Sequence, residues 1–314
     1  MEELLDPGLG QVRVFLKHDD NKPRKLKYNL GHSRLLTFGG AYSNHIRAVA
    51  EAGARHGIET IGVIRGEEHL PLNPSLARAA ACGMTLTYLD RASYRRKHTE
   101  EVLAGLRARW GEDIAILPEG GSNAAAVRGC AELPPEIEHE IGRDYDVLCC
   151  PVGTGGTLAG ISAGLPEGRR ALGFAVLKGG GFLEGEVARL QREAYGRTWR
   201  NWSVNLDYHF GGYAKSTPAL DGFIAKYRVE RIYVAKMLYG ILDLARQGAF
   251  APGTRIVAVV TGRPEAPAGE AVAGPPEEAV IGAPGEAVIG APGEAVIGAP
   301  GEAVIGQPST PVEE

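Results

Sequence analysis

The sequence is poor in cysteine, tryptophan and methionine, and it has little net charge. Its 314 residues include 4 cysteines, 3 tryptophans and 3 methionines, and the formal net charge is -4. So small a charge excludes the strong attraction to polyanions on which nucleic-acid binding depends. The absence of any run of about 18 apolar residues argues against a membrane partner. The first ten residues also lack the basic and apolar segments of a secretory signal, so a cytoplasmic location is expected.

The cysteines form no recognisable disulfide or metal framework. They lie among apolar or small residues, without CxxC spacing and without histidines at the spacings of a zinc motif. The four are Cys82, Cys130, Cys149 and Cys150. The sequence therefore predicts buried free thiols and no metal site.

Within the region 1–262, apolar runs alternate with helical patterns from residue 35 onwards. Strands are expected at 35–38, 60–64, 84–89, 114–117, 147–152, 171–177 and 256–260. Helices are expected at 44–56, 98–109, 157–165, 182–195 and 234–247. This alternation predicts an α/β fold with mostly parallel sheets flanked by helices. We expect two interleaved lobes, the smaller at approximately 36–145, with a ligand cleft at the carboxyl ends of the strands.

The segment 263–314 differs in composition from the rest of the chain, since it consists largely of Pro, Gly, Ala and Glu. The sequence Glu-Ala-Val-Ile-Gly recurs with a period of eight, beginning at Glu278, Glu286, Glu294 and Glu302. Each repeat offers only one valine and one isoleucine for burial, which cannot offset the loss of chain entropy. The composition predicts a disordered acidic tail, with a β-solenoid or elastic repeat as the alternative.

The stretch PVGTGGTLAG at 151–160 has the pattern of an anion-binding turn. An apolar strand leads into Gly153, Thr154, Gly155, Gly156 and Thr157, after which a helical pattern begins. Unpaired N–H groups and the positive end of the helix dipole face an anion at such a junction. Because the P-loop lysine and the GxGxxG spacing are both absent, the turn favours the phosphate of a cofactor. The alternative is an ordinary strand-to-helix turn.

Three further segments contain clustered polar residues. GGAYSNHIR at 39–47 joins a strand end to a helix start and suits a carboxylate. EGGSN at 119–123 again follows a strand. DDNKPRKLKYNL at 19–30 is basic and, taken alone, indicates a solvated face.

Taken together, these segments resemble the fold-type II pyridoxal-phosphate enzymes, most closely the family of 1-aminocyclopropane-1-carboxylate (ACC) deaminase and D-cysteine desulfhydrase. The resemblance extends over about residues 12–262. It rests on the ordered motifs NKPRKLKYNL, LLTFGGAYSNH, PEGGSN, VGTGGTLAGI, YHFGGYAK, IYVAKMLYGILDLARQG and PGTRIVAVVTG. It implies a fold like that of the tryptophan synthase β subunit, pyridoxal 5'-phosphate as cofactor, a small amino-acid substrate and a homodimer.

The resemblance also implies roles for residues in the first half of the chain. Lys22 matches the lysine that binds the cofactor covalently and then carries a proton, whereas Lys17, Lys25 and Lys27 have no such role. The turn that follows the first predicted strand matches the substrate-carboxylate site, with one member also bonding the cofactor's phenolic oxygen. That turn comprises Ser43, Asn44 and His45, and Asn44 is the residue assigned to the phenolic oxygen.

The remaining assignments fall in the second half of the chain. The turn at 153–157 matches the phosphate cradle, and Thr261 matches the residue that faces the pyridine nitrogen. Tyr213 and Tyr233 match tyrosines near the substrate, so the expected catalytic residues are these two with Lys22 and Ser43. Without the resemblance, both tyrosines and Thr261 would be read as packing residues.

The expected reaction depends on Thr261 and on the residue after Tyr233. A neutral threonine hydroxyl leaves the ring nitrogen unprotonated, which favours elimination of a good leaving group. ACC deaminases of the family have Glu after the active-site tyrosine, whereas this chain has Val234. The first hypothesis is therefore D-cysteine desulfhydrase-like α,β-elimination to pyruvate, ammonia and sulfide. The second is ACC deamination to 2-oxobutanoate and ammonia, in which Ser43 and Tyr233 assist ring opening.

A third hypothesis is a degenerate cofactor-binding protein without turnover. The segments on either side of Lys22 are shorter than in the family pattern, so its helix is expected to have two turns or fewer. Pro23 biases Lys22 towards extended geometry. The family pattern continues after Thr-Gly with a second glycine, whereas Arg263 follows Gly262 here.

Overall fold

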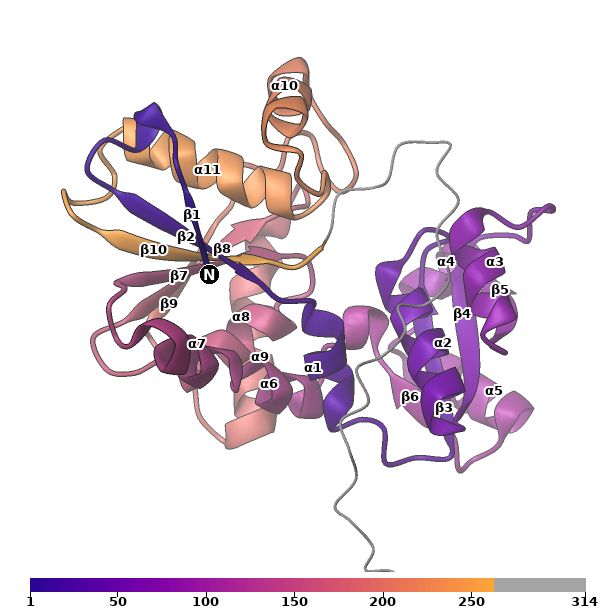
Figure 1. The fold of residues 1–314 in the computed structure, drawn as a ribbon. Coiled ribbons are helices and arrows are strands. Elements are labelled where there is room, and N and C mark those ends of the chain that lie inside the picture. The colour runs from indigo at the N-terminus through magenta and orange to yellow at the C-terminus, as the bar shows by residue number, and fades with distance from the viewer. Residues whose placement is uncertain (263–314) are drawn as a thin grey trace, which may run out of the picture. The chain divides into compact units, whose positions relative to one another are not determined.

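The computed structural model describes residues 1–262, which form two sheets with flanking helices (Figure 1). The larger sheet has the order β1-β2-β10-β7-β8-β9 and is parallel apart from the antiparallel β1–β2 pair. The smaller sheet has the order β5-β4-β3-β6 and is parallel throughout. The predicted α/β fold is confirmed. The predicted tail at 263–314 lies outside the described residues.

The strands of the two sheets come from separate parts of the chain. The larger sheet contains β1 (Glu2–Leu4), β2 (Arg13–His18), β7 (Val147–Val152), β8 (Arg170–Ala175), β9 (Trp202–Asn205) and β10 (Arg255–Val260). The smaller sheet contains β3 (Arg34–Gly39), β4 (Glu59–Arg65), β5 (Thr85–Leu89) and β6 (Ala115–Leu117). Every predicted apolar run forms a strand, and β1, β2 and β9 are additional.

Helices connect the strands in both sheets. Those of the first half are α1 (Asn21–Lys27), α2 (Asn44–His56), α3 (Pro74–Ala81), α4 (Arg91–Arg95), α5 (Glu100–Trp110), α6 (Ala124–Cys130) and α7 (Leu133–Ile141). Those of the second half are α8 (Gly156–Gly164), α9 (Leu183–Tyr195), α10 (Pro218–Tyr227) and α11 (Val234–Arg246). Short 3-10 turns occur at η1 (Pro7–Leu9), η2 (Glu119–Gly121) and η3 (Gly180–Phe182).

The larger sheet is covered on both faces. Helices α6 to α9 share one core with β7, β8 and β10, whereas α11 packs on the opposite face (Figure 1). All six residues of β7 are buried, as expected for a central strand covered on both sides. The sequence-based lobe boundary of 36–145 includes α6 and α7, whose buried residues belong to the core of the larger sheet. The larger sheet and its helices form the large lobe, and the smaller sheet with α2 to α5 forms the small lobe.

Helix α1 leads from β2 towards the small lobe and is only seven residues long, as expected. The prediction that Lys22 is extended is wrong, because Lys22 lies in the first turn of α1. The Asp20 side chain caps this turn by accepting a hydrogen bond from the Lys22 N–H at 3.3 Å. Pro23 also falls in the first turn, where a missing N–H removes no helical hydrogen bond. A β-carbon on Gly129 of α6 would lie 2.0 Å from the Arg24 carbonyl oxygen, so only glycine allows this approach.

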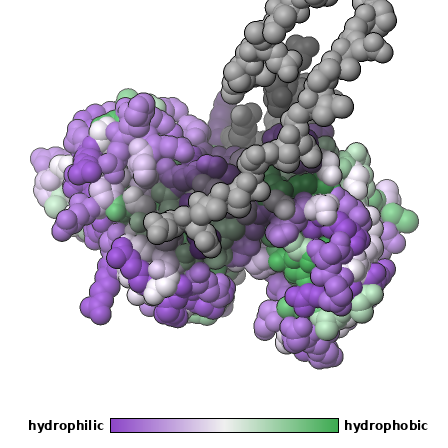
Figure 2. All heavy atoms as spheres, turned by 90° about the horizontal axis from the view of Figure 1, so that it is seen from below, coloured by the Kyte–Doolittle hydropathy of each residue, from purple (hydrophilic) through white to green (hydrophobic). Residues whose placement is uncertain are grey.

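The face of the described residues that Figure 2 shows is mainly polar. Hydrophilic residues cover most of the face shown in Figure 2, and hydrophobic residues occur there in small patches. None of the helices within residues 1–262 has the length and apolar character that crossing a bilayer requires. The cysteines are free thiols, three buried and Cys82 partly exposed, which largely confirms the prediction.

Candidate cofactor site

The turn between β7 and α8 is held open by glycine. Gly155 caps α8 with φ +79°, a left-handed conformation that a side chain would strain. A β-carbon on Gly156 would lie 2.6 Å from Ser122 Oγ, and one on Gly120 would lie 2.9 Å from Thr154 Oγ1. The Ser122 and Thr154 hydroxyls are hydrogen-bonded at 2.6 Å. The segment after β6, which includes Gly120 and Ser122, therefore packs directly against the turn between β7 and α8. The first N–H groups of α8 at this turn have no partner within the helix.

Helix α1 reaches the same turn and places Lys22 near the end of β10. Asn21 Nδ2 donates to Thr157 Oγ1 at 2.8 Å. Lys22 Nζ donates to the Thr261 carbonyl at 3.1 Å and lies 3.3 Å from Asp20 Oδ1, with the side chain 20% exposed. The amine is thus partly buried, and the residues proposed for covalent binding and for the ring nitrogen are neighbours.

Lys25 is a site residue that the sequence interpretation left without a role. It is buried, and its Nζ donates to the Gly120 carbonyl at 3.1 Å and to Ser122 Oγ at 3.4 Å. Burial lowers the pKa of Lys25, and the positive charge of Lys22 lowers it further. Its two hydrogen-bond partners are neutral oxygens, which leaves one N–H of the buried ammonium to bond an anion. The sequence did contain one indication that Lys25 belongs to the site: it lies three residues after Lys22, and residues three apart share a helix face.

The other two lysines near Lys22 lie in surface ion pairs. Lys17 pairs with Glu140, and Lys27 Nζ lies 2.7 Å from Glu132 Oε2. These carboxylates satisfy both ammonium groups. Neither lysine therefore provides a cation for a ligand, in contrast to Lys25.

The turn proposed for the substrate carboxylate begins α2. Ser43 caps the helix, with its Oγ accepting from the Ile46 N–H at 3.3 Å. The Asn44 Oδ1 accepts from Arg47 Nη2 at 2.7 Å. Since the first N–H groups of a helix have no partner within it, this turn offers backbone donors to an anion.

The His45 imidazole points into the small lobe. The Thr37 hydroxyl donates to the Leu117 carbonyl at 3.1 Å, so it accepts from His45 Nε2 at 2.8 Å. A β-carbon on Gly121 would lie 2.8 Å from His45 Cε1. Burial, with the positive charge of Lys25, lowers the pKa of His45 to about 3. The ring is therefore neutral near pH 7, and what His45 offers an anion is its backbone N–H.

The two tyrosines lie together beside the turn between β7 and α8. Their hydroxyls are hydrogen-bonded at 3.3 Å, and the rings of Tyr213 and Tyr233 meet edge to face at 5.8 Å. A β-carbon on Gly153 would lie 3.4 Å from Tyr233 Cε1, so the Tyr233 ring contacts the turn. Burial raises the pKa of Tyr233 well above its usual value. Its phenol is therefore protonated at neutral pH and can donate a hydrogen bond.

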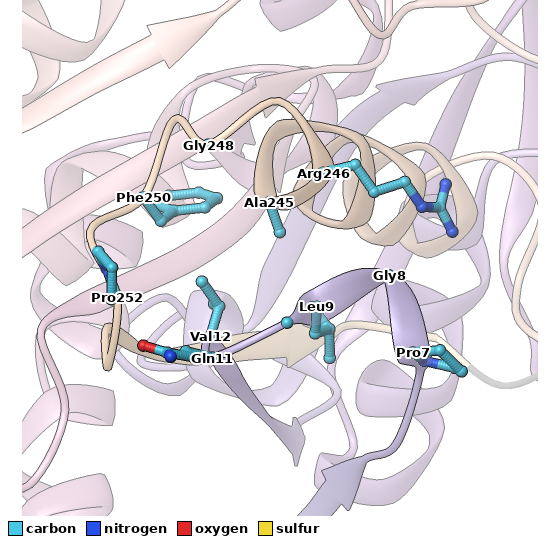
Figure 3. Close-up of a pocket in the computed structure, with 11 residues that line it drawn as sticks. Pro7, Gly8, Leu9, Gln11, Val12, Ala245, Arg246, Gly248, Phe250 and Pro252 are labelled. Atoms are coloured by element: carbon cyan, nitrogen blue, oxygen red, sulfur yellow. The ribbon is translucent and has the colours of Figure 1, made fainter.

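A separate hollow of about 470 Å³ lies between η1 and the end of α11 (Figure 3). Its walls are mainly glycine and apolar residues such as Leu9, Val12 and Phe250, with the Arg246 guanidinium at the side. None of the predicted site residues lines it. It lacks the groups that proton transfer requires, so it is not the candidate catalytic site.

The fold and the site are those expected of an α/β protein that binds a phosphorylated carbonyl compound. The glycine cradle at α8 and the buried cation of Lys25 suit the phosphate, and the Lys22 amine suits the carbonyl group. A family model described as pyridoxal-phosphate dependent enzyme matches residues 9–178. The chain belongs to this family, and its cofactor is pyridoxal phosphate. The family expectation from the sequence motifs is confirmed.

The chain is also similar to individual proteins over most of its length. A relative from Pyrococcus horikoshii is 31% identical over 276 residues, and the match covers 79% of this chain and 84% of the relative. A relative from Pyrococcus furiosus is 32% identical over 280 residues, with the same shares of the two chains. Both are named "Putative 1-aminocyclopropane-1-carboxylate deaminase".

Solved structures share the fold. A crystal structure described as that of an ACC deaminase homologue matches with a TM-score of 0.71 and 28% identity, covering 83% of this chain and 88% of the other. A hydrogen sulfide-producing enzyme from Fusobacterium nucleatum matches with a TM-score of 0.58 and 13% identity, covering 84% of this chain and 93% of the other. At that low identity the second match shows the fold alone.

Proposed function

We propose that the chain catalyses pyridoxal-phosphate-dependent α,β-elimination from a small amino acid, with D-cysteine as the first candidate and pyruvate, ammonia and sulfide as products. The observation that carries this proposal is the start of α11. Tyr233 keeps its phenolic proton, and the next side chain, Val234, is fully buried in the core. This position thus provides a hydrogen-bond donor for a leaving group and no carboxylate to act as base.

Four parts of the chain would hold the reactants. The first turn of α8 and the Lys25 ammonium would bind the cofactor phosphate. The first turn of α2, with Ser43, Asn44 and His45, would bind the substrate carboxylate through its N–H groups, and Asn44 would also bond the cofactor's phenolic oxygen. Thr261 would face the ring nitrogen with a neutral hydroxyl. When bound, pyridoxal phosphate supplies an aldehyde that takes up the substrate amino group and a ring that withdraws electrons from Cα.

The proton transfers would use two side chains. The Lys22 amine, on a flexible stem, would take the proton from the substrate Cα. The Tyr233 hydroxyl, which donates to the Tyr213 hydroxyl in the structure, would redirect this hydrogen bond towards the departing sulfur at Cβ. Because Thr261 provides no carboxylate for the ring nitrogen, the cofactor would be a weaker electron sink, which suits rapid loss of a good leaving group.

The second candidate is ACC deamination to 2-oxobutanoate and ammonia. It is favoured by the names of the two Pyrococcus relatives and by the similarity to the ACC deaminase homologue. In that reaction Ser43 and Tyr233 would assist opening of the cyclopropane ring. Val234, where the deaminases have Glu, argues for elimination instead.

The test uses the purified full chain with added pyridoxal phosphate. We expect pyruvate and sulfide from D-cysteine at a higher kcat/KM than 2-oxobutanoate from ACC. Lys22→Ala should lower the D-cysteine rate by about 10²- to 10⁴-fold, since it removes the proton acceptor. No product from a panel of D- and L-amino acids with leaving groups at Cβ would refute elimination.

A separate measurement addresses the hypothesis of a cofactor-binding protein without turnover. Borohydride reduction followed by peptide mass analysis should find the cofactor attached to Lys22. Attachment without product from either substrate class would support that third hypothesis, and product formation would exclude it.

A further inference from the structure

Lys236, in the first turn of α11, is a buried cation whose hydrogen-bond partners are all backbone carbonyls. Its side chain has no exposed surface. The Nζ donates to the carbonyls of Gly212 at 2.7 Å, His209 at 2.9 Å and Val176 at 3.0 Å. Three N–H donors meet three acceptors, so the ammonium is fully satisfied. We call these three oxygens the carbonyl cage.

The ammonium form fits the cage better than the amine. Burial lowers the pKa of Lys236 to about 8, which leaves the group mostly charged at pH 7. A neutral amine would have only two hydrogens for three acceptors. The nearby carboxylate of Glu230 is engaged by the N–H groups of Ile232, Tyr233 and Val234. The cage itself is therefore neutral.

Two of the three carbonyls belong to a strained segment. Phe210 and Ala214 have φ values of 51° and 56°, which are uncommon for residues with a side chain, and Gly211 and Gly212 have φ values of 88° and 125°. Such a succession of positive φ values persists only where the surroundings hold it in place. Tyr213 lies within this segment.

We propose that Lys236 is a positioning residue: its ammonium is an internal monovalent cation that holds the strained 209–214 segment against β8 and α11, and so fixes the Tyr213 hydroxyl on that of Tyr233. Converging carbonyl oxygens of this kind also bind potassium after it loses its water. Removal of the ammonium should therefore create a site for a small monovalent cation. The catalytic part of this inference rests on the proposed function, whereas the structural part does not.

The test compares Lys236→Met with wild type in the full-length protein loaded with cofactor. Methionine fills a similar volume but removes the ammonium donor from all three carbonyls. The His209 and Gly212 oxygens keep only the backbone N–H groups of Gly212 and Lys215. We expect the melting temperature to fall by roughly 10 °C. Hydrogen exchange should accelerate at the Gly212 amide, which bonds the His209 carbonyl at 3.0 Å. Lys215→Met, which removes an exposed ammonium from the next part of the chain, should change neither quantity.

Cation rescue distinguishes an ion site from simple packing. Ammonium or potassium chloride should restore the melting temperature and the exchange protection of Lys236→Met. Tetramethylammonium chloride at the same ionic strength should not, because the ion is too large for the cage. If the elimination is confirmed, kcat of the variant should fall about 10- to 100-fold with little change in KM, and ammonium should raise it again.

The outcomes separate this inference from the proposed function. Melting and exchange need no substrate, so they test the cage even if no elimination is observed. Unchanged exchange in Lys236→Met, or equal recovery with all three salts, would overturn the inference. If that variant does not fold, Lys236→Gln, which retains two donors, should show a smaller loss and the same order of salts. Absence of that order would again refute the ion site.

Discussion

At the residue scale, Lys22 and Lys25 show how one short helix can provide two different amines. Lys22 remains partly exposed, near the Thr261 carbonyl. Lys25 is buried against η2, among neutral oxygens. An ammonium in such a place is unfavourable until an anion arrives, because the loss of hydration is uncompensated. We expect the cofactor phosphate to provide that compensation.

Lys25→Met should therefore weaken cofactor binding without harming the fold. Loss of one charge-assisted contact corresponds to a rise in the cofactor Kd of roughly 10- to 100-fold. Without cofactor, the variant should melt at the same temperature as wild type or higher, since it no longer buries an unpaired charge. Titration of the absorbance of the bound cofactor measures the first effect. Lys27→Met, at the surface pair with Glu132, is the control, and equal Kd values in both variants would contradict the assignment.

His45 predicts how stability depends on pH. Its pKa in the folded chain, about 3, is below the ordinary value of 6.5, so between these values the unfolded chain binds the extra proton. The contribution of His45 to the free energy of unfolding is fully present above pH 6.5. It is lost as the pH falls towards 3, by up to about 1.4 kcal/mol per pH unit. His45→Gln should have a shallower slope than wild type in urea unfolding between pH 6 and 4. His32→Gln, at an exposed position, should retain the wild-type slope; parallel slopes for all three would exclude this role.

At the scale of elements, the sequence predicted the strands whose residues are buried on both faces. It missed the features that depend on contacts with residues outside the local pattern. The run at 147–152 is apolar because both faces of β7 are covered, so its pattern sufficed. β2 has only three consecutive apolar residues between charged ones, and so short a run did not mark it as a strand. Helical geometry at Lys22 depends on the Asp20 cap, which outweighed the local effect of Pro23. Burial of Lys25 depends on η2, far away in the sequence, and no local pattern could indicate it.

Helix α11 is fixed at its start by a single carboxylate. Glu230 accepts from the N–H groups of Ile232 and Tyr233 at 2.8 Å and of Val234 at 3.0 Å. Because this charge also faces the positive end of the helix, Glu230→Gln should lower the free energy of unfolding by about 1–3 kcal/mol. Urea denaturation measures the loss. Glu184→Gln, at an exposed position in the first turn of α9, should cost less, and equal costs would show that the cap contributes nothing special.

At the scale of the whole described region, the two lobes contact each other where the cofactor is proposed to bind. Ser122 follows β6 of the small lobe, and Thr154 follows β7 of the large lobe. Lys25 of α1 reaches the same place, and Leu26 of that helix packs in the small-lobe core. A ligand that binds this junction stabilises the folded chain by mass action, and it does so through both lobes at once.

The coupling between the lobes can be measured with a double-mutant cycle on Ser122→Ala and Thr154→Ala. The two hydroxyls are hydrogen-bonded at 2.6 Å, so their coupling energy in unfolding should be about 1 kcal/mol. This coupling energy should change when pyridoxal phosphate is added, because the ligand competes for or completes the same hydrogen bonds. The matched control is the pair Tyr208 and Asp243, which bond at 2.8 Å within the large lobe. Tyr208→Phe and Asp243→Asn should show a coupling energy that the cofactor leaves unchanged. Additive effects at Ser122 and Thr154, with and without cofactor, would place the cofactor away from this contact.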